Sequence, residues 1–508
     1  MRAAFLACAL SALVACGGNS SRGQSVCDNV VPAPTACMTQ CDPSPGAPAT
    51  CPGGYHCTED GKCDAVCSQA GMECGDGYRC TPDGRCVGND DCIGLECKIK
   101  DCAKDNKPLT TISGTVFAPN GTLPLYGIQV YVPNVPVGPP QDGAVCDRCS
   151  DSIPGYPIAL TKTDESGRFS LVNVPSGTEV PVIIQTGKWR REIKVPTVAE
   201  CADTPLAPTE TRLPKNKSEG YMPKIAISTG NADSLECLVR KLGIDDAELG
   251  TAGSDKRLHL FADTGSPGQG ANMFKSGFPG GSGSFANSTM LWNAVTTLKP
   301  YDIVILSCEG NQYPQTKSQD AMDALKAYAD LGGRVFLSHW HNIWIEGSTQ
   351  GGGNQAPAVW TDIATWSNGG NLANGTIDVI DEVSNPNGKS FADWMVNVNG
   401  STVRGEVVVN EGRTTAMQVN AGRGERWTYV KGGSMSTQNF QFTTPNEVTP
   451  DNRCGKVVFS DMHVSGDSDS QPGTPFPDGC ASSALTPQEK ALAFMFFDIA
   501  SCIQPPLL

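Results

Sequence analysis

The sequence predicts a multidomain protein with disulfide-rich small modules, then an all-β sandwich, then an α/β part with a mostly parallel sheet. Three observations predict this order. Thirteen of the 23 cysteines lie between Cys27 and Cys102, apolar residues alternate after Thr110, and strands alternate with helices after Lys224. The length of 508 residues exceeds what one core usually holds. The net charge of −15 argues against a nucleic-acid partner.

The amino terminus reads as an export signal. Residues 1–15 carry one charge at Arg2 and an apolar run too short to span a bilayer. The string Leu13-Val14-Ala15-Cys16 resembles a bacterial lipobox, in which Cys16 is lipidated and becomes the first mature residue. We therefore expect a lipoprotein attached to the membrane through the lipid at Cys16, with a tether over 16–26. The predicted location is the outer membrane of the cell envelope, facing an oxidising compartment. An ordinary signal peptide with a chance cysteine is the alternative.

Residues 27–102 contain an internal repeat. The string from Cys51 to Cys63 matches the string from Cys74 to Cys86, and each contains an Asp-Gly pair that predicts a tight hairpin turn. Units this short cannot bury enough apolar surface, so we expect disulfides to hold them. The cysteines assigned to such bonds are Cys41, Cys51, Cys57, Cys63, Cys67, Cys74, Cys80 and Cys86.

The turn and cysteine spacing of these repeats resembles small EGF-like modules of secreted proteins. The resemblance leaves the connectivity open. Zinc binding is the alternative role for these cysteines, but the repeats lack the close pairs of structural zinc sites. The mature chain has an odd number of cysteines once Cys16 is lipidated, so we expect at least one free or intermolecular thiol, with Cys308 as a candidate.

Residues 110–199 predict a β-sandwich. Apolar residues alternate at 112–116, 128–132 and 180–184, and Asn120-Gly121 and 163–169 supply turns. The order of three strings, at 112–116, at 125–132 and at 163–177 with Val174-Pro175-Ser-Gly177 at its end, resembles the carboxypeptidase regulatory-like domain. That family is a transthyretin-like sandwich, also grouped with carbohydrate-binding-like folds, and implies a non-catalytic accessory or adhesive module.

An insert from Pro133 to Pro157 interrupts this pattern and holds Cys146-Asp-Arg-Cys149. A C-x-x-C string can be redox-active or half of a zinc site, but a structural disulfide to another loop is the favoured interpretation. Residues 200–221 are expected to form a linker.

Residues 222–508 predict an α/β part. Strands are expected at 225–227, 258–261, 301–306, 335–337 and 457–459, and helices at 235–242, 292–298, 322–329 and from Pro487 to Cys502. The string Thr486-Pro-Gln-Glu489 predicts a capping box for the last helix. Alternating strands and helices indicate a sheet covered on both faces.

Three strings in this part, at 301–306, at 332–339 and at 455–463, resemble the glutamine-amidotransferase-like superfamily and its trehalose-utilisation (ThuA-like) group. The resemblance implies a flavodoxin-like parallel sheet. The superfamily's nucleophilic cysteine follows the strand that here ends at Leu337, where this chain reads Ser338-His339-Trp340-His341. The domain is therefore expected to be degenerate for glutaminase chemistry.

Polar residues follow three of the predicted strands. Because ligands bind at the carboxyl ends of strands in open α/β sheets, these residues are candidate site residues. The candidate catalytic residues are Ser338 as nucleophile with His463 as base, and Cys308; the candidate ligands of a divalent metal are His339, His341, Asp461 and His463. Alternatively these side chains only cap strands through hydrogen bonds.

The whole sequence therefore favours a lipid-anchored cell-envelope protein that is a non-catalytic binding or scaffold protein, with an extracellular carbohydrate or protein as ligand. The alternative is a metal-assisted or serine-type hydrolase that acts on an extracellular carbohydrate or peptide through the strand-end cluster. The two hypotheses differ in whether the histidines hold a metal.

Overall fold

The computed structural model describes residues 25–29, 35–44, 50, 51, 54–67, 74, 78–81, 84–88, 92, 94–149, 153–264, 270–349, 354–432, 436–464, 473–481 and 483–503. The predicted signal peptide at 1–15, Cys16 and most of the predicted tether lie outside these residues. The chain divides into two compact units, Met1–Cys92 and Ile93–Leu508.

The first unit is built from two short antiparallel hairpins. After α1 (Val26–Asn29) and the 3-10 helix η1 (Thr35–Met38), β1 (His56–Cys57) pairs with β2 (Cys63–Asp64), and β3 (Tyr78–Cys80) pairs with β4 (Cys86–Gly88). Gly61 and Gly84 have φ of +76° and +73°, the left-handed region that glycine adopts at little cost. Both expected hairpins are confirmed.

Disulfides hold this unit together. Cys27 pairs with Cys37. In each repeat the first cysteine pairs with the third and the second with the fourth; the pairs are Cys41–Cys57, Cys51–Cys63, Cys67–Cys80 and Cys74–Cys86. The eight predicted disulfide cysteines are thereby confirmed as such, and the pairing that the sequence left open is settled. Such bonds indicate that the chain folds in an oxidising compartment.

The second unit begins with η2 (Gly94–Lys98) and η3 (Cys102–Asp105), followed by two facing sheets. One sheet has the order β10-β9-β6-β7 and the other β11-β5-β8. The strands are β5 (Thr111–Thr115), β6 (Gln129–Pro133), β7 (Pro157–Lys162), β8 (Arg168–Val172), β9 (Gly177–Thr186), β10 (Trp189–Val198) and β11 (Asp203–Pro205). Apolar residues of both sheets share one core, as the alternation predicted.

The structure corrects the expectation that residues 200–221 form a linker. Strand β11 lies within it and pairs in parallel with β5, and Cys201 is bonded to Cys102. Thr211 and Leu213 are buried against the sandwich. An unpaired edge of β5 would leave backbone groups exposed, and residues 203–205 cover it. A Pro/Thr-rich composition therefore did not indicate a solvated chain here.

The α/β part is organised around an eleven-stranded sheet with the order β13-β14-β12-β16-β17-β24-β23-β22-β19-β20, to which β15 adds beside β14. Its strands are β12 (Ile225–Ser228), β13 (Leu249–Thr251), β14 (Leu258–Ala262), β15 (Ala286–Asn287), β16 (Ile303–Leu306), β17 (Arg334–Ser338), β19 (Thr376–Ile380), β20 (Glu406–Val409), β22 (Glu425–Val430), β23 (Thr437–Thr444) and β24 (Gly455–Ser460). A separate pair is formed by β18 (Ala364–Trp366) and β21 (Ala416–Val419).

The sheet is mixed, which corrects the expectation of a mostly parallel one. Strands from β13 to β24 in the sheet order are parallel, whereas β24, β23, β22, β19 and β20 are joined by antiparallel pairing. The physical reason lies in the connections. Parallel neighbours need a crossover of a dozen or more residues, and only six residues separate β22 from β23.

The helices of this part are short apart from α5, α8 and α9. Their bounds are α2 (Leu235–Lys241), η4 (Asp246–Glu248), α3 (Thr289–Trp292), α4 (Val295–Leu298), η5 (Pro314–Thr316), α5 (Gln319–Asp330), η6 (His339–Asn342), α6 (Ile343–Glu346), α7 (Ala358–Thr361), α8 (Gly388–Asn397), η7 (Pro450–Asn452) and α9 (Pro487–Ala500). The predicted capping box at Thr486 and Glu489 is present. Among the described residues, no helix has the length and apolarity to cross a membrane.

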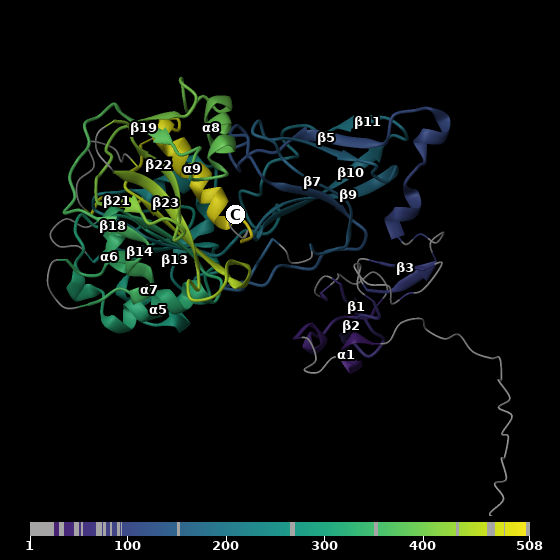
Figure 1. Ribbon diagram of the computed structural model, residues 1–508, viewed down its shortest axis with the longest axis horizontal. Coiled ribbons are helices and arrows are strands. Elements are labelled where there is room, and N and C mark those ends of the chain that lie inside the picture. Colours follow the sequence, from purple (N-terminus) through teal and green to yellow (C-terminus); the bar gives the residue numbers. More distant parts are fainter. Residues whose placement is uncertain are drawn as a thin grey trace, which may run out of the picture. The chain divides into compact units, whose positions relative to one another are not determined.

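The sandwich and the α/β sheet share a continuous core within the second unit. Helix α9 lies between them (Figure 1). Its Phe496 and Phe497 contact Trp189 of β10, with ring centroids 5.6 Å apart in both pairs. Phe494 stacks on Tyr126. The two parts are therefore packed as one body.

Candidate metal centre

Buried polar side chains gather where the parallel strands of the α/β sheet end. The segments after β12, β14, β16, β17 and β24 carry them, and parallel strands present their carboxyl ends along one edge. Burial of so many ionisable groups needs an explanation, because each costs free energy unless it is paired. The buried residues are Asp233, Asp263, Cys308, Glu309, Ser338, His339, His341, Asp461 and His463.

Three of these residues come together closely enough to ligate one ion. The ligand atoms of Cys308, His339 and His463 all lie within 4.8 Å of one another. Cys308 Sγ is 3.3 Å from His339 Nδ1, and the imidazole centroids of His339 and His463 are 5.1 Å apart. Their exposed fractions are 0%, 4% and 0%. Cys308 is the free cysteine among the described residues, which confirms the expected odd thiol.

The backbone at His339 is held in an unfavourable conformation. His339 follows β17 directly and has φ of +42°, in the left-handed region. A non-glycine residue there costs on the order of 1 kcal/mol or more, and such strain persists where the surroundings fix it. The turn directs the chain from β17 into η6 and brings the imidazole of His339 to the thiol of Cys308.

Several ligand atoms of the cluster have no hydrogen-bond partner within the described part of the chain. They are Nε2 of His339 and both ring nitrogens of His463. A buried polar atom left unpaired costs about 1–3 kcal/mol. On the same edge, Glu236 Oε2 and Asp263 Oδ1 are also unpaired. One nitrogen from each imidazole, together with the thiol sulfur, is a donor set for a bound cation.

Burial decides the protonation of the three residues. It raises the pKa of the Cys308 thiol to about 12 and lowers the pKa of His339 to about 3. It also places the pKa of His463 well below its usual value. The residues therefore form a neutral thiol beside neutral imidazoles at neutral pH. A nucleophilic cysteine needs a lowered pKa, so Cys308 lacks the activation that its candidacy as a catalytic residue required.

Two of the four predicted metal ligands lie outside this cluster. His341 Nε2 donates to the carbonyl of Ser307 at 3.0 Å, and its Nδ1 accepts from Trp344 Nε1 at 3.0 Å. Asp461 accepts from the amides of Thr415 and Ala416 at 2.8 and 2.9 Å. Both side chains have structural partners. His339 and His463 are the two predicted ligands that the structure brings together.

The predicted pairing of Ser338 with His463 is absent. The Ser338 hydroxyl donates to the carboxylate of Asp233 instead. Asp233 also accepts from the amide of Val464 at 2.7 Å. Burial raises the pKa of Asp233 to about 7. Because the Ser338 hydroxyl donates to a carboxylate and not to His463, His463 is not placed to take its proton, as the base of a serine nucleophile must.

The sequence interpretation named neither Lys317 nor Asp233 among the candidate site residues of this edge. Lys317 is buried and forms an ion pair with Glu309 at 2.5 Å, while the amide of Thr264 donates to the same carboxylate at 2.7 Å. Burial lowers the pKa of Lys317, and the ammonium of Lys317 helps to lower the pKa of Glu309. No local pattern marks Lys317, whereas Asp233 could have been found because it lies in the loop after the strand predicted at 225–227.

No family model matches the chain, and no curated protein matches it. Two mutant type II cohesin–X-dockerin complexes from Acetivibrio cellulolyticus resemble 29% of this chain and 78% and 79% of theirs, at 17% and 18% identity with TM-scores of 0.14 and 0.15. A cytoplasmic protein of Salmonella typhimurium resembles 54% of this chain and 98% of its own, at 11% identity with a TM-score of 0.27. Likenesses this slight carry no inference about fold or function.

Proposed function

We propose that this protein is exported and binds one thiophilic transition-metal ion through Cys308, His339 and His463. The observation that carries the proposal is the convergence of these three ligand atoms within 4.8 Å, with unpaired imidazole nitrogens. Thiolate and imidazole are the ligands of zinc and of copper in proteins. Metal binding would displace the thiol proton of Cys308 and give one nitrogen of each imidazole a partner.

The site favours retention of an ion over turnover of a large substrate. Three protein ligands leave a fourth tetrahedral position open, as in catalytic zinc sites, and this supports the metal-assisted hydrolase as a second candidate. All three ligands are buried, however, which leaves little room for a polymer. The serine-type hydrolase is not proposed, because the Ser338 hydroxyl donates its hydrogen bond to Asp233 and not to His463.

Metal analysis of the purified mature chain tests the proposal. We expect stoichiometric uptake of Zn²⁺, and with Co²⁺ a thiolate charge-transfer band. Cys308→Ser should abolish that band, and His463→Ala should weaken metal affinity at least 100-fold, because one of three ligands is lost.

His259→Gln is the matched control. His259 is buried too, but its ring nitrogens contact Tyr301 Oη and the Ser254 carbonyl at 2.8 and 3.2 Å. This variant should retain the metal. Absence of stoichiometric Zn²⁺ or Cu²⁺ after titration of the folded wild type would overturn the proposal, as would equal retention in all variants.

We also propose attachment to the cell envelope through lipid at Cys16, and we keep EGF-like repeats at 27–102, a regulatory-like sandwich at 110–199 and an amidotransferase-like part at 222–508 as proposed assignments. The lipobox string supports the first. The disulfides support an oxidising, extracellular setting for all of them. A carbohydrate or protein ligand fits such a setting.

A further inference from the structure

The fold encloses the metal cluster of the proposed function. Cys308 and His463 are fully buried, and His339 contacts the ring of Trp340, with the two ring centroids 4.8 Å apart. Trp340 itself is partly exposed. A catalytic zinc site keeps one position open for water or substrate. Ligands buried to this degree favour a reaction that needs no bound substrate, namely the gain or loss of an electron.

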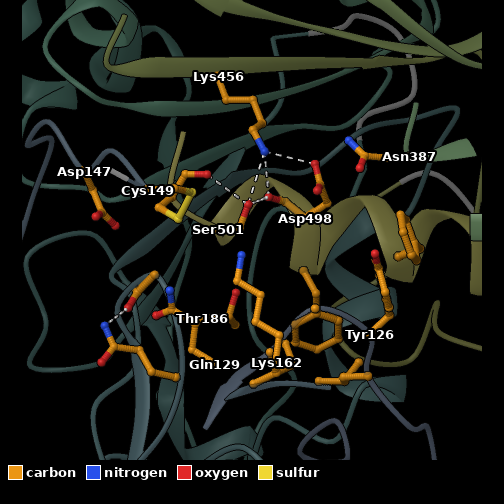
Figure 2. Close-up of a pocket in the computed structure, with 18 of the residues that line it drawn as sticks. Tyr126, Gln129, Asp147, Cys149, Lys162, Thr186, Asn387, Lys456, Asp498 and Ser501 are labelled. Atoms are coloured by element: carbon orange, nitrogen blue, oxygen red, sulfur yellow. Dashed lines mark hydrogen bonds and ion pairs between the residues drawn. A yellow bond between two sulfur atoms is a disulfide. The ribbon is translucent and has the colours of Figure 1, made fainter. Parts of the chain in front are cut away.

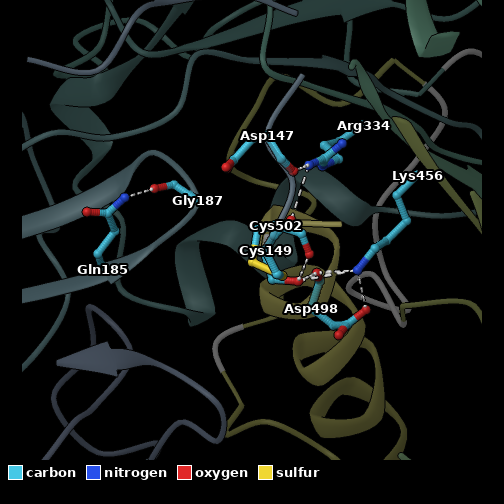
Figure 3. Close-up of a disulfide and its surroundings, with 9 residues drawn as sticks. Asp147, Cys149, Gln185, Gly187, Arg334, Lys456, Asp498 and Cys502 are labelled. Carbon is cyan, nitrogen blue, oxygen red and sulfur yellow. Dashed lines mark hydrogen bonds and ion pairs between the residues drawn. A yellow bond between two sulfur atoms is a disulfide. The ribbon is translucent and has the colours of Figure 1, made fainter. Parts of the chain in front are cut away.

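The cavity between the sandwich and the α/β part offers a substrate no way to this cluster. The cavity measures about 230 Å³, and Lys162 of β7 and Lys456 of β24 belong to its two sides (Figure 2). The disulfide Cys149–Cys502 joins the sandwich insert to the segment after α9 beside it (Figure 3). None of the three proposed metal ligands lines this cavity. A small molecule held there would not touch the metal.

The number and the type of the ligands separate copper from zinc. A structural zinc site has four protein ligands, whereas the described residues bring three together here. Two imidazoles and one thiolate are the ligand set of the copper sites that transfer electrons. Among the described residues no carboxylate belongs to the group. Asp461, two residues before His463, accepts from the amides of Thr415 and Ala416 instead.

Backbone amides are directed at the sulfur of Cys308. The amide of Gly310 donates to Sγ at 3.4 Å, and the amide of Trp340 is a second donor to the same thiol. Hydrogen bonds to the cysteine sulfur tune the reduction potential of copper–thiolate sites. Because they withdraw electron density from the sulfur, they stabilise Cu(I) relative to Cu(II).

The positions of the ligands are set by the fold. The turn from β17 into η6 holds His339 at a φ of +42°, and the ring centroid of His339 lies 5.1 Å from that of His463. Cys308 comes from the separate segment after β16. Ligands that are already in place need little reorganisation when the charge on the ion changes. Such a cluster is suited to an ion that alternates between two oxidation states.

We infer that the ion is copper and that the cluster is a one-electron redox centre. The inference rests on the proposed metal binding by Cys308, His339 and His463. When Cu(I) binds, the thiol proton of Cys308 leaves to solvent and a copper–sulfur bond forms. Oxidation then removes one electron from Cu(I) and gives Cu(II), with the thiolate and both imidazoles still bound. The electron passes to a one-electron acceptor, an oxidised metal complex or metalloprotein.

Copper loading of the full mature chain, with its disulfides intact, tests the inference. Metal-free protein is loaded with an equivalent of Cu(I) in the absence of oxygen and is then oxidised with ferricyanide, which takes up one electron. We expect an intense visible band from thiolate-to-Cu(II) charge transfer and a small copper hyperfine splitting in the electron paramagnetic resonance spectrum. Ascorbate should bleach the band, and ferricyanide should restore it over repeated cycles.

Two variants connect the band to these ligands. Cys308→Ser should abolish the band, because Cys308 is the free cysteine among the described residues. His463→Gly should lose the band and regain it when imidazole is added, because the ring can enter the space that the side chain left. His259→Gln is the matched control and should show the wild-type band, since both ring nitrogens of His259 have partners outside the cluster. Circular dichroism checks that each variant is folded.

The outcomes separate this inference from the proposed function. A chain that binds Zn²⁺ or Co²⁺ stoichiometrically but gives no band with copper would overturn the inference and leave the proposed function standing. Release of copper in the first oxidation, or a band that persists in Cys308→Ser, would also overturn the inference. A folded chain that binds none of these ions would overturn both.

Discussion

At the scale of single residues, several carboxyl groups at the carboxyl edge of the parallel strands hold their protons to a higher pH than exposed carboxyl groups do. Burial raises the pKa of Asp233, Asp263 and Asp461 to about 7 in each case, and that of Glu236 to about 8. A carboxyl group whose pKa is raised by folding holds its proton in the folded state at a pH where the unfolded chain has released it. These groups therefore stabilise the fold in acid and lose that effect as pH rises.

Asp233→Asn should flatten the pH dependence of stability. The pKa of Asp233 rises from 3.8 to about 7 on folding, so its contribution is complete below pH 3.8 and is lost as pH rises through about 7. The amide keeps an acceptor for Val464 and a donor toward Ser338. In urea unfolding of metal-free protein, wild type should lose on the order of a few kcal/mol more than the variant between pH 5 and pH 8.

Asp362→Asn is the control for this comparison, because Asp362 is exposed, and it should follow the wild type. Identical pH profiles for wild type and Asp233→Asn would contradict the assignment. The sequence did not reveal the raised pKa of Asp233, because burial, not residue type, sets that pKa.

At the scale of elements, two disulfides bond the insert between β6 and β7 to the α/β part. Its Cys146 is bonded to Cys454 and its Cys149 to Cys502. The interpretation of the C-x-x-C string as structural is confirmed, since each cysteine pairs with a distant partner. The bonds close loops of 308 and 353 residues. Long loops of this kind cost the unfolded chain the most conformational entropy.

Removal of one of these disulfides should lower the stability of the second unit against unfolding. In Cys149→Ser/Cys502→Ser, we expect the free energy of unfolding to fall by about 2–5 kcal/mol, measured by guanidinium denaturation. Cys27→Ser/Cys37→Ser is the control. That bond lies in the first unit, so the main unfolding transition of residues 93–508 should not move. A shift of equal size in both variants would show that the link through the insert has no special role.

The strands were predicted best where their pattern was local. The alternating segments of the sandwich and the predicted strands at 225–227, 301–306 and 335–337 are strands in the structure, the second of them over 303–306. The antiparallel half of the sheet was missed, because strands such as β23 are buried along their length yet contain polar residues. Asn439 there donates to Thr428 Oγ1 at 3.0 Å, a partner that only the fold supplies.

At the scale of the whole molecule, the boundary between the two compact units follows Cys92. It does not lie at the later changes of sequence pattern, after Thr110 and after Lys224. The sandwich and the α/β part are joined by a shared core and by ion pairs such as Arg257–Asp142 at 2.7 Å. The cavity between them depends on this joining. The first unit is held together by disulfides between its own cysteines.

Cys16→Ser should release the protein from membranes. Expressed with its natural amino terminus in a bacterial host that processes lipoboxes, the wild type should label with palmitate and sediment with membranes. The variant should lose the label, because the acylated sulfur is absent. Cys8→Ser, which alters the signal itself, is the control and should stay attached. Continued attachment of Cys16→Ser would contradict the lipid anchor.

Local periodicity and the count of cysteines were enough to predict the disulfide-rich beginning, the sandwich strands, the parallel strands and the odd thiol. It also placed His339 and His463 at strand ends. Only the tertiary structure decided that Cys308 joins these two while His341 and Asp461 do not, that the sheet is mixed, and that the sandwich packs on α9. These outcomes depend on distances between residues far apart in the chain, which local pattern does not encode.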